Sequence, residues 1–284
     1  MAKRISLITD STCDISSEWR EQYEITVIPM TIIFGDKAYL DGVDITAQEF
    51  YAKLQNETNH PTTSQPAPTV FLDAYKKLAS EGAEEIVVIL ISSEMSGTYA
   101  SAVQAAEEFN LPVHIADSRS NSMGLGWQVI AAARAREAGG GAVEMLAAAE
   151  KTRETMVYYV ALDTIEYLAR GGRIGGAIKF LDSLLRIKPL IYVNHKTGSV
   201  AAALPARSRK LVLKSLYKEF FKQMDTSRPM HLTVLHGNAE EEAREIMGRI
   251  QEEYHPAELN LTIVSPVLGA HTGPRAVAIC GYYE

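Results

Sequence analysis

The stretch Glu85–Phe109, with the sequence EIVVILISSEMSGTYASAVQAAEEF, contains the pattern that decides the fold. It begins with Glu85–Ser92, a continuous apolar run rich in Ile and Val, which is typical of a strand buried on both faces of a parallel sheet. A hydroxyl-rich turn follows, and from Gly97 onward the chain becomes rich in Ala and Glu. We therefore predict a strand, a loop at its carboxyl end and then a helix, with Ser96 as the helix N-cap.

The same alternation extends over the first half of the chain. Arg4–Thr9, Thr26–Phe34 and Pro112–Ala116 are further short apolar runs, and amphipathic segments with helix-start signals lie between them. Strands that alternate with helices predict a doubly wound open sheet of parallel strands. Ligands of such sheets bind beyond the carboxyl ends of the strands, where the hydroxyl-rich turn is expected.

The second half of the chain has a different pattern, in which a turn sequence at Lys196–Gly198 indicates a hairpin and Ser208–Met224 indicates a basic helix. The overall prediction is an α/β fold. A parallel-sheet α/β domain is expected over residues 1–155, and an α+β domain with a mixed or antiparallel sheet over residues 156–284. The strands expected in the second half are Tyr158–Leu162, Pro189–Val193, Val200–Leu204, Leu232–Leu235, Leu259–Val264 and Ala276–Tyr282.

Composition excludes several classes of function. The chain has 284 residues and a formal net charge of −7, so no basic field would attract nucleic acid or an anionic membrane. Only two cysteines occur, which fits a reducing compartment, and no apolar run approaches the roughly 20 residues of a membrane span. We expect a cytoplasmic protein without nucleic-acid partners and without integral membrane insertion.

Two hydroxyl-rich turns are candidates for binding an anion. Pro61–Pro68 carries Thr62, Thr63 and Ser64 ahead of a helix start, and Ser92–Thr98 stands at the end of a predicted strand. Free N–H groups and the helix dipole favour an anion at such helix starts. The alternative is ordinary capping, in which the hydroxyls satisfy only the local backbone.

Two glycine-rich segments carry cationic or titratable side chains. Arg170–Gly176 could bring a guanidinium close to an anion, or it could be a helix C-cap with solvated arginines. In Leu268–Arg275, His271 is expected in a loop before the last strand, as a ligand-binding residue or with a structural hydrogen bond. The other histidines are scattered without an HExxH pattern, so no metal site is expected.

The stretch Ile8–Asp14 follows the first strand and contains two acids and a thiol. Hydrolase and metal interpretations remain open, but capping of the turn by Asp10, Ser11 and Asp14 is favoured. Cys13 is expected to be a small buried residue rather than a reactive thiol.

Together, these motifs resemble the DegV family of bacterial fatty-acid-binding proteins, in order along nearly the whole chain. The matching segments are Ile8–Asp14, Thr62–Pro66, Ser96–Tyr99, Asp117–Ser118, Ser122–Gly126, Gly171–Ile174 and Leu268–Pro274. One departure is Ala67, where many members have Ser, so a hydroxyl is absent there.

The resemblance implies two domains with a long-chain fatty acid between them. By motif position, Thr63 and Ser96 hold the carboxylate with help from the Gly97 backbone, and Arg173 and His271 lie near it. The best-understood members are acyl-carrier subunits of a two-part fatty acid kinase, which places them in phospholipid synthesis. They present the bound acid to a separate ATP-dependent catalytic subunit. Acyl preference does not carry over.

The resemblance also implies that Arg207 and Arg209 belong to a surface that docks the kinase subunit. The protein is accordingly expected to be a non-catalytic lipid carrier without a cofactor. The alternative is a self-sufficient small-molecule kinase or a Ser hydrolase, and a regulatory binding module without lipid is a third reading. Against the kinase, no phosphate-cradling Gly-Lys motif is found, and against the hydrolase, no nucleophile elbow surrounds Ser96.

Overall fold

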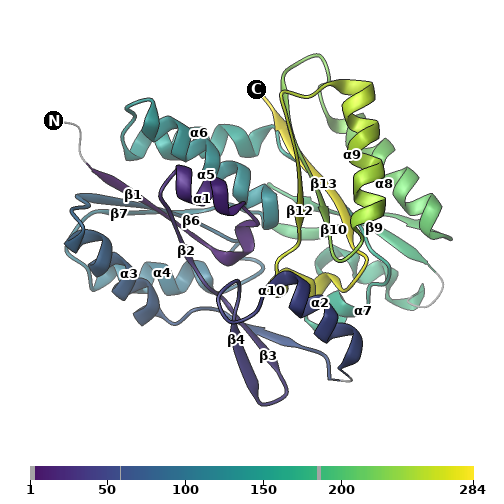
Figure 1. The fold of residues 1–284 in the computed structure, drawn as a ribbon, viewed down its shortest axis with the longest axis horizontal. Coiled ribbons are helices and arrows are strands. Elements are labelled where there is room, and N and C mark those ends of the chain that lie inside the picture. Colours follow the sequence, from purple (N-terminus) through teal and green to yellow (C-terminus); the bar gives the residue numbers. More distant parts are fainter. Residues whose placement is uncertain (1–3, 58, 184–186) are drawn as a thin grey trace.

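The computed structural model describes residues 4–57, 59–183 and 187–284, and its first sheet is the parallel one that the sequence predicts (Figure 1). This sheet has the strand order β2-β1-β6-β7, and all neighbouring pairs in it are parallel. β1 and β6 therefore lie at its centre, and their carboxyl ends lead into neighbouring loops. The strands are β1 (Ile5–Asp10), β2 (Ile25–Ile28), β6 (Glu85–Leu90) and β7 (Val113–Asp117).

Helices cover both faces of the parallel sheet, because successive side chains of a strand point to opposite faces. On β6, Ile86 shares a core cluster with Phe71 of α3, whereas Val87 shares another with Trp127 of α5. Pro68 occupies the first turn of α3, which is the helix expected after the hydroxyl-rich turn. The helices of this half are α1 (Ser17–Gln22), α2 (Ala47–Asn56), α3 (Pro68–Ser80), α4 (Thr98–Glu107), α5 (Ser122–Glu137) and α6 (Ala142–Glu154).

The second large sheet has the order β10-β9-β8-β13-β11-β12 and is mixed, as predicted. Only β11 and β12 pair in parallel, and β9 and β10 form the expected antiparallel hairpin. Its strands are β8 (Val157–Ala161), β9 (Lys188–Asn194), β10 (Ser199–Ala206), β11 (Met230–His236), β12 (Glu258–Ile263) and β13 (Val277–Tyr283). The remaining helices are α7 (Glu166–Arg170), a 3-10 helix at Gly175–Ser183, α8 (Arg209–Gln223), α9 (Glu240–Tyr254) and α10 (Pro266–Thr272).

The prediction of one strand over Thr26–Phe34 is wrong, because the strand is interrupted at Pro29. Proline has no backbone N–H for a sheet ladder, so the parallel pairing of β2 ends just before it. The second part of the run enters a small antiparallel sheet of order β4-β3-β5, which the sequence analysis missed. Its strands are β3 (Thr31–Phe34), β4 (Lys37–Leu40) and β5 (Thr62–Ser64).

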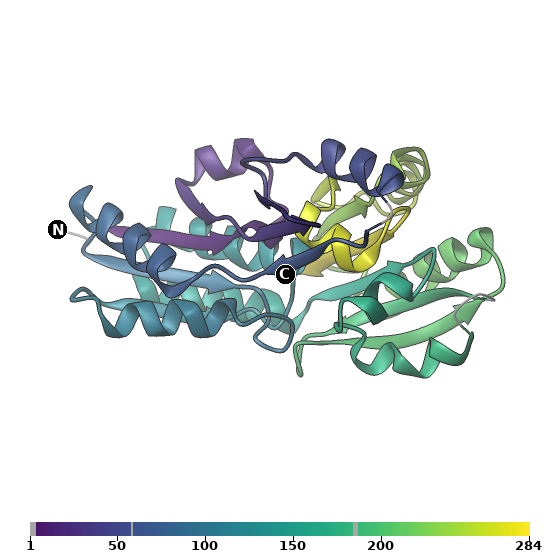
Figure 2. The ribbon, with the colours of Figure 1, turned by 90° about the horizontal axis from the view of Figure 1, so that it is seen from below.

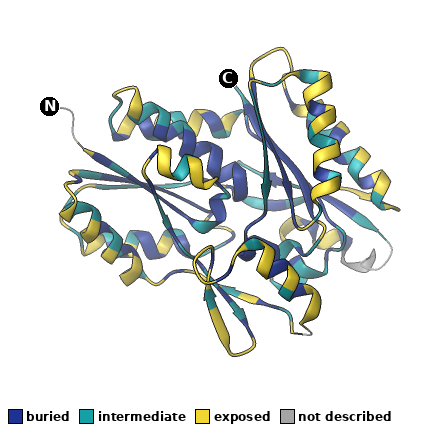
Figure 3. Cartoon of the chain, in the orientation of Figure 1, coloured by how far each residue is buried: buried dark blue, intermediate teal, exposed yellow. Residues whose placement is uncertain are grey.

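The two large sheets share one hydrophobic core. A single cluster contains Leu7 of β1, Trp127 of α5, Val160 of β8 and Ala278 of β13. Figure 3 shows this continuity as buried segments that run from the parallel sheet into the mixed one. A smaller cluster joins the three-stranded sheet and α2 to α10. Among the described residues, none of the helices combines the length and apolar character needed to cross a membrane.

Candidate functional site

A cavity of about 270 Å³ lies where the loop after β6 meets β5, α10 and the mixed sheet. Most of its wall is apolar, and the strands supply much of this wall, including Val160, Ile191, Val193, Val200 and Ala278. Polar side chains line another part of it, and they come from β5 and the residue after it, the loops after β6 and β7, the turn after α7, and α10. A mostly apolar wall with a few polar groups is the usual composition of a small-molecule site.

Strand alternation explains the apolar wall. On β8, Tyr158 and Val160 face the shared core and the cavity, whereas Val157 and Ala161 face the cluster under α8 and α9. The cavity therefore lies on the face of the mixed sheet opposite α8 and α9. β9 and β10 extend this wall, and Figure 2 shows their hairpin reaching from the mixed sheet toward the loops of the parallel sheet.

The polar part brings together residues that are far apart in the sequence. Oγ1 of Thr63 lies 2.8 Å from Nε2 of His271, across a separation of 208 residues. Thr63 is on β5, which pairs with β3 through Ile32, and His271 is in the last turn of α10. The expectation of a loop around His271 is wrong, because Pro266 starts a short helix that continues through His271 and ends before Gly273.

Ser96 also lines the cavity, but it is not the helix N-cap that was predicted. Gly97 holds that position on α4, and the Ser96 hydroxyl instead bonds Oγ1 of Thr98 at 2.8 Å and accepts the Thr98 N–H at 3.3 Å. Gly97 does not itself line the cavity. It permits close packing by Gln65, whose side chain would overlap with a Cβ at this position and which donates to Oγ of Ser101 at 3.2 Å.

Arg173 connects the turn after α7 with the loop after β6. Its Nε donates to the Met95 carbonyl at 3.2 Å, and its Nη1 donates to the Gly171 carbonyl at 2.8 Å. Gly171 has a second role, since a Cβ there would overlap with Nδ1 of His271. The structure thus brings Thr63, Ser96, Arg173 and His271 to one cavity, and their role in binding stays a prediction.

Burial sets the electrostatics of His271. It lowers the pKa of the imidazole to about 4, and the positive charges of Arg173 and His60 act in the same direction. Nδ1 is inaccessible to solvent and has no hydrogen-bond partner among the described residues. His271 is therefore neutral near pH 7, and Nε2 is the ring nitrogen that bonds Thr63.

Arg207 and Arg209 lie outside this cavity and differ from each other. Arg209 begins α8 and is mostly buried, with Nε and Nη2 bonded to both carboxylate oxygens of Glu242 on α9 at 2.9 and 2.6 Å. Arg207, in contrast, is exposed on the segment before α8. The structure therefore leaves Arg207 accessible to a partner and holds Arg209 in an intramolecular ion pair.

Sequence reasoning missed several residues that line the cavity. Gln65 lies within the Thr62–Pro66 motif but was given no role, and Asn121 directly precedes Ser122–Gly126. Asn121 donates through Nδ2 to Sδ of Met95 at 3.1 Å. The apolar residues gave no signal of their own, because strand residues that face a cavity are of the same types as those that face a core. In the part of the chain that the structure describes, no group of three or more His, Cys, Asp or Glu side chains is placed to hold a metal ion.

Known proteins match this chain over almost its whole length. The profile of the family described as "Uncharacterised protein, DegV family" matches residues 4–284. The DegV domain-containing protein SCO2569 of Streptomyces coelicolor is 34% identical over 280 residues, with 98% of each chain covered. A fatty-acid-binding DegV family protein from Thermus thermophilus has a TM-score of 0.92 and 31% identity, covering 99% of this chain and 100% of the other. DegV, a fatty acid binding protein from Bacillus subtilis, has a TM-score of 0.91 and 29% identity at the same coverage. The chain belongs to the DegV family.

Proposed function

We propose that this protein is a non-catalytic carrier that binds a long-chain fatty acid in the cavity and presents its carboxylate to a separate kinase subunit. The observation that carries the proposal is the division of the cavity into an apolar wall and a polar part with Thr63, Ser96 and His271. The relatives from Thermus thermophilus and Bacillus subtilis, which bind fatty acids, support the ligand class.

The tail supplies the affinity in this proposal. Burial of one methylene group contributes about 0.8 kcal/mol, so a tail of about 15 methylenes contributes on the order of 12 kcal/mol. Association costs about 4 to 15 kcal/mol, which the tail offsets largely without help from the head group. The polar residues therefore need only to orient the carboxylate.

Neutral donors suit this task. In the proposed complex, the Thr63 hydroxyl accepts the Nε2–H of neutral His271 and donates its own hydrogen to the carboxylate, and Ser96 donates to the second oxygen. Gly97 lies just outside the cavity wall, next to Ser96 at the start of α4, and we propose that its amide assists Ser96 when the carboxylate is bound. A direct Arg–carboxylate pair would lower the nucleophilicity of the oxygen, whereas Arg173 can stabilise the charge that develops later.

The chemical step belongs to the partner, which holds ATP. A carboxylate oxygen attacks the γ-phosphorus, the bond from that phosphorus to the β,γ-bridging oxygen breaks, and ADP leaves with the released electron pair. The product is an acyl phosphate. The geometry disfavours a hydrolase, because Ser96 bonds Thr98 and not His271, and because Nδ1 of His271 has no acid partner among the described residues.

The head-group assignment is tested with Thr63→Val and Ser96→Ala. Each variant removes one hydrogen bond to a charged group, which is worth about 1.5–3 kcal/mol, so affinity for palmitate should fall roughly 10- to 100-fold. The ¹³C resonance of a labelled carboxyl should shift in both variants. Thr62→Val is the matched control, because Thr62 is an exposed neighbour on β5 that does not line the cavity. Unchanged affinity and carboxyl resonance in both variants would refute the assignment, and extraction of the native protein without any lipid would refute the carrier itself.

The docking role is tested with Arg207→Glu. We expect a loss of phosphorylation by the kinase subunit with unchanged fatty acid retention, because Arg207 is exposed and does not line the cavity. Lys218→Glu on α8 is the control with the same change of charge at another exposed position. If both variants slow phosphorylation equally, only general electrostatic attraction is involved.

A further inference from the structure

The loop that follows β1 contacts each of the three segments that carry Thr63, Ser96 and His271. We call it the Asp10–Asp14 loop: it runs from Asp10, the last residue of β1, through a 3-10 turn at Ser11–Cys13 to Asp14. None of the contacts described above assigns it a role. Three of its side chains reach outward from it, and each is bonded to a different segment. No ligand contact is attributed to this loop, because its polar groups are already bonded within the protein.

Asp10 contacts the segment that carries Ser96. Its carboxylate is fully buried and accepts the backbone N–H of Ile91 at 2.8 Å through Oδ2. Through Oδ1 it accepts the N–H of Thr12 at 2.9 Å and the hydroxyl of the same residue. Ile91 lines the cavity and begins the loop that leads from β6 to Ser96. Asp10 therefore fixes the start of that loop.

Ser11 contacts the small sheet that carries Thr63. Its Oγ accepts the Met30 N–H at 3.1 Å and donates to the buried carboxylate of Asp41 at 2.8 Å. Asp41 in turn donates its backbone N–H to the Met30 carbonyl at 2.9 Å. Met30 immediately precedes β3, and β3 pairs with β5, so these bonds place the strand on which Thr63 lies.

Asp14 contacts the helix that carries His271. Its Oδ1 accepts the backbone N–H of Ser265, the N-cap residue of α10, at 3.1 Å, and its Oδ2 accepts the hydroxyl of Ser122. The backbones of Asp14 and Ser122 both have positive φ, at 51° and 48°. L-residues rarely adopt this conformation, and it persists only where surrounding contacts hold it.

We propose that the Asp10–Asp14 loop is a positioning element that fixes β5, the Ser96 loop and α10 relative to one another. Within it, Asp14 is the positioning residue for His271. Without the Asp14 contact, the start of α10 keeps its packing and the bond from the Val267 N–H to Asp41, but loses the bond that fixes its N-cap residue, Ser265. The 2.8 Å approach of His271 to Thr63 is then no longer enforced from that end of the helix. The proposal rests on the proposed function only for the identity of the ligand. The positions of β5, the Ser96 loop and α10 relative to one another can be tested without it.

The position of the acids favours this role over a catalytic one, because Asp10, Asp14 and Asp41 do not line the cavity. Burial raises the pKa of Asp14 and of Asp41 to about 7, and the negative charge of Asp10 adds to both shifts. Burial raises the pKa of Tyr51 of α2 well above its ordinary value, and the nearby charges of Asp14 and Asp41 act in the same direction. Buried acids are expensive to desolvate, and here the backbone N–H groups of Ile91 and Ser265 offset part of that cost for Asp10 and Asp14.

The test compares Asp14→Ala with Asp14→Asn in lipid-free protein, using the pKa of His271 by ¹H–¹³C NMR. Asparagine keeps the oxygen that accepts the Ser265 N–H, and the Ser122 hydroxyl can turn to accept from its amide. We therefore expect His271 to titrate near 4 in the Asn variant, as in the native protein. In the Ala variant the pKa should rise by about one unit or more toward 6.5, because α10 shifts and the ring becomes solvated.

Ile250→Ala is the control for loss of stability alone, since Ile250 is fully buried in the cluster under α9 and does not line the cavity. It should lower the midpoint of unfolding without moving the pKa of His271. If Asp14→Ala fails to fold, Ser122→Ala takes its place, because it removes only the hydroxyl that Oδ2 accepts, and a smaller rise is expected. An unchanged pKa of His271 in the folded Ala variant, or in the Ser122 variant, overturns the proposal.

The outcome is separable from that of the proposed function because the measurement needs no fatty acid. A shifted pKa of His271 in Asp14→Ala, together with a native protein that binds no fatty acid, supports the positioning role and refutes the carrier. An unshifted pKa of His271 in Asp14→Ala, together with a native protein that retains fatty acid, supports the carrier and refutes the positioning role.

Discussion

His271 shows how burial sets the chemistry of a single side chain. Its ring packs against Gly171 and touches Thr63, so water that would stabilise a charged imidazole is excluded. His231 has the opposite environment, since Glu258 and Glu284 bond its two nitrogens at 2.5 and 2.9 Å. These carboxylates outweigh the effect of burial and raise the pKa of His231. The two histidines are therefore expected to differ in charge in mildly acidic solution.

The first prediction concerns the order in which these histidines take up protons. In lipid-free protein, His231 should protonate first as the pH falls, and His271 last, with a midpoint near 4. Bound fatty acid should raise the pKa of His271, because a nearby carboxylate favours the charged ring. An NMR titration of Cε1 resonances measures both, and a midpoint for His271 above 6 without lipid would contradict the assignment.

The lowered pKa of His271 also predicts how the stability of the folded protein changes with pH. The unfolded chain protonates this histidine near 6.5, whereas the folded chain does so only near 4. Between these values the unfolded state binds more protons, so the contribution of His271 is complete above pH 6.5 and is lost as the pH falls toward 4. The free energies of unfolding of the native protein and of His271→Asn, measured by denaturant titration, should therefore become more similar as the pH is lowered through this interval.

At the scale of elements, the β9–β10 hairpin closes the cavity from the side of the mixed sheet. Val193 and Val200 of the hairpin line the cavity, and its tip contacts two loops of the parallel sheet. Oγ of Ser92 donates to the Gly198 carbonyl at 2.7 Å, and Nη1 of Arg119 donates to the Lys196 carbonyl at 3.2 Å. The tip is therefore fastened to the same loop region that carries Ser96.

Gly198→Ala should loosen this tip. Gly198 has a φ of +74°, and a Cβ there would overlap with Oγ of Ser92, so the variant has both backbone strain and a clash. Gly139→Ala is the matched control, with a φ of +89° and no atom within 4 Å of the added Cβ. We expect Gly198→Ala to lose about 1–3 kcal/mol more in urea unfolding than the control, and to release fatty acid faster.

Equal losses for the two glycine variants would mean that the hairpin tip does not pack on Ser92 in solution. The double variant Ser92→Ala with Gly198→Ala checks the cause. Removal of the hydroxyl relieves the clash but not the strain, so the double variant should recover part of the difference.

Elements with a strong local signal were predictable from the sequence, and those set by distant contacts were not. The apolar run Glu85–Ser92 is a local signal, and the strand predicted from it is confirmed. The capping box of Thr46 with Glu49 at the start of α2 is a signal of the same local kind. The break in Thr26–Phe34 depends on a second sheet that competes for the chain after Pro29. α10 was missed because glycines around His271 are equally typical of a loop, and its helix is held by Asp14 from the other end of the chain.

For the site, motif resemblance supplied the residue types, but not the contacts between them. The bond from Thr63 to His271 could not be predicted, since it needs both the unrecognised β5 and the unrecognised α10. Ser96 was misassigned because a serine and a glycine before a helix both suit the N-cap, and here Gly97 takes it.

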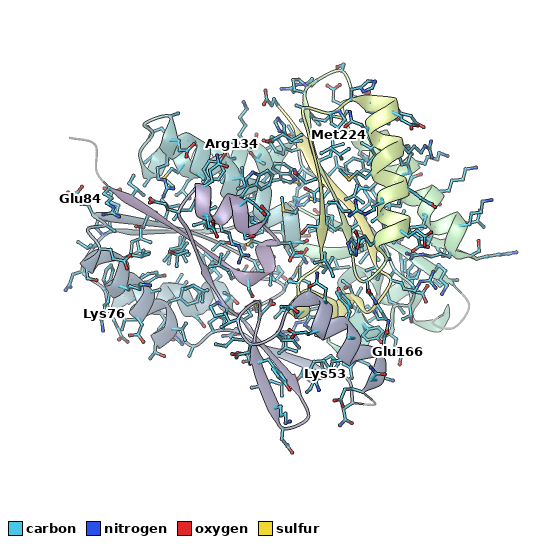
Figure 4. All side chains as sticks on the ribbon, in the orientation of Figure 1. Lys53, Lys76, Glu84, Arg134, Glu166 and Met224 are labelled. Atoms are coloured by element: carbon cyan, nitrogen blue, oxygen red, sulfur yellow. The ribbon has the colours of Figure 1, made fainter. Side chains whose placement is uncertain are left out.

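At the scale of the whole molecule, polar contacts connect the two halves of the chain. Arg134, labelled in Figure 4, extends from α5 to the start of β12, where it forms a two-pronged ion pair with Glu258 at 3.1 and 2.6 Å. Glu258 is shared with His231 of β11, and these partners hold its pKa at about 2, although burial acts in the opposite direction. Polar and apolar contacts thus join the sheets along the same boundary.

The last prediction follows from the shared core. If residues 1–155 and 156–284 were independent domains, calorimetry would show two transitions, and a destabilising variant would move only its own. We expect one transition, because one apolar cluster includes strands from both large sheets. Ile86→Ala and Ile250→Ala form a matched pair, since both residues are fully buried, in the cores of the parallel and mixed sheets respectively. Each should cost about 2–5 kcal/mol and lower the same midpoint, and two separated transitions in either variant would contradict a single cooperative unit.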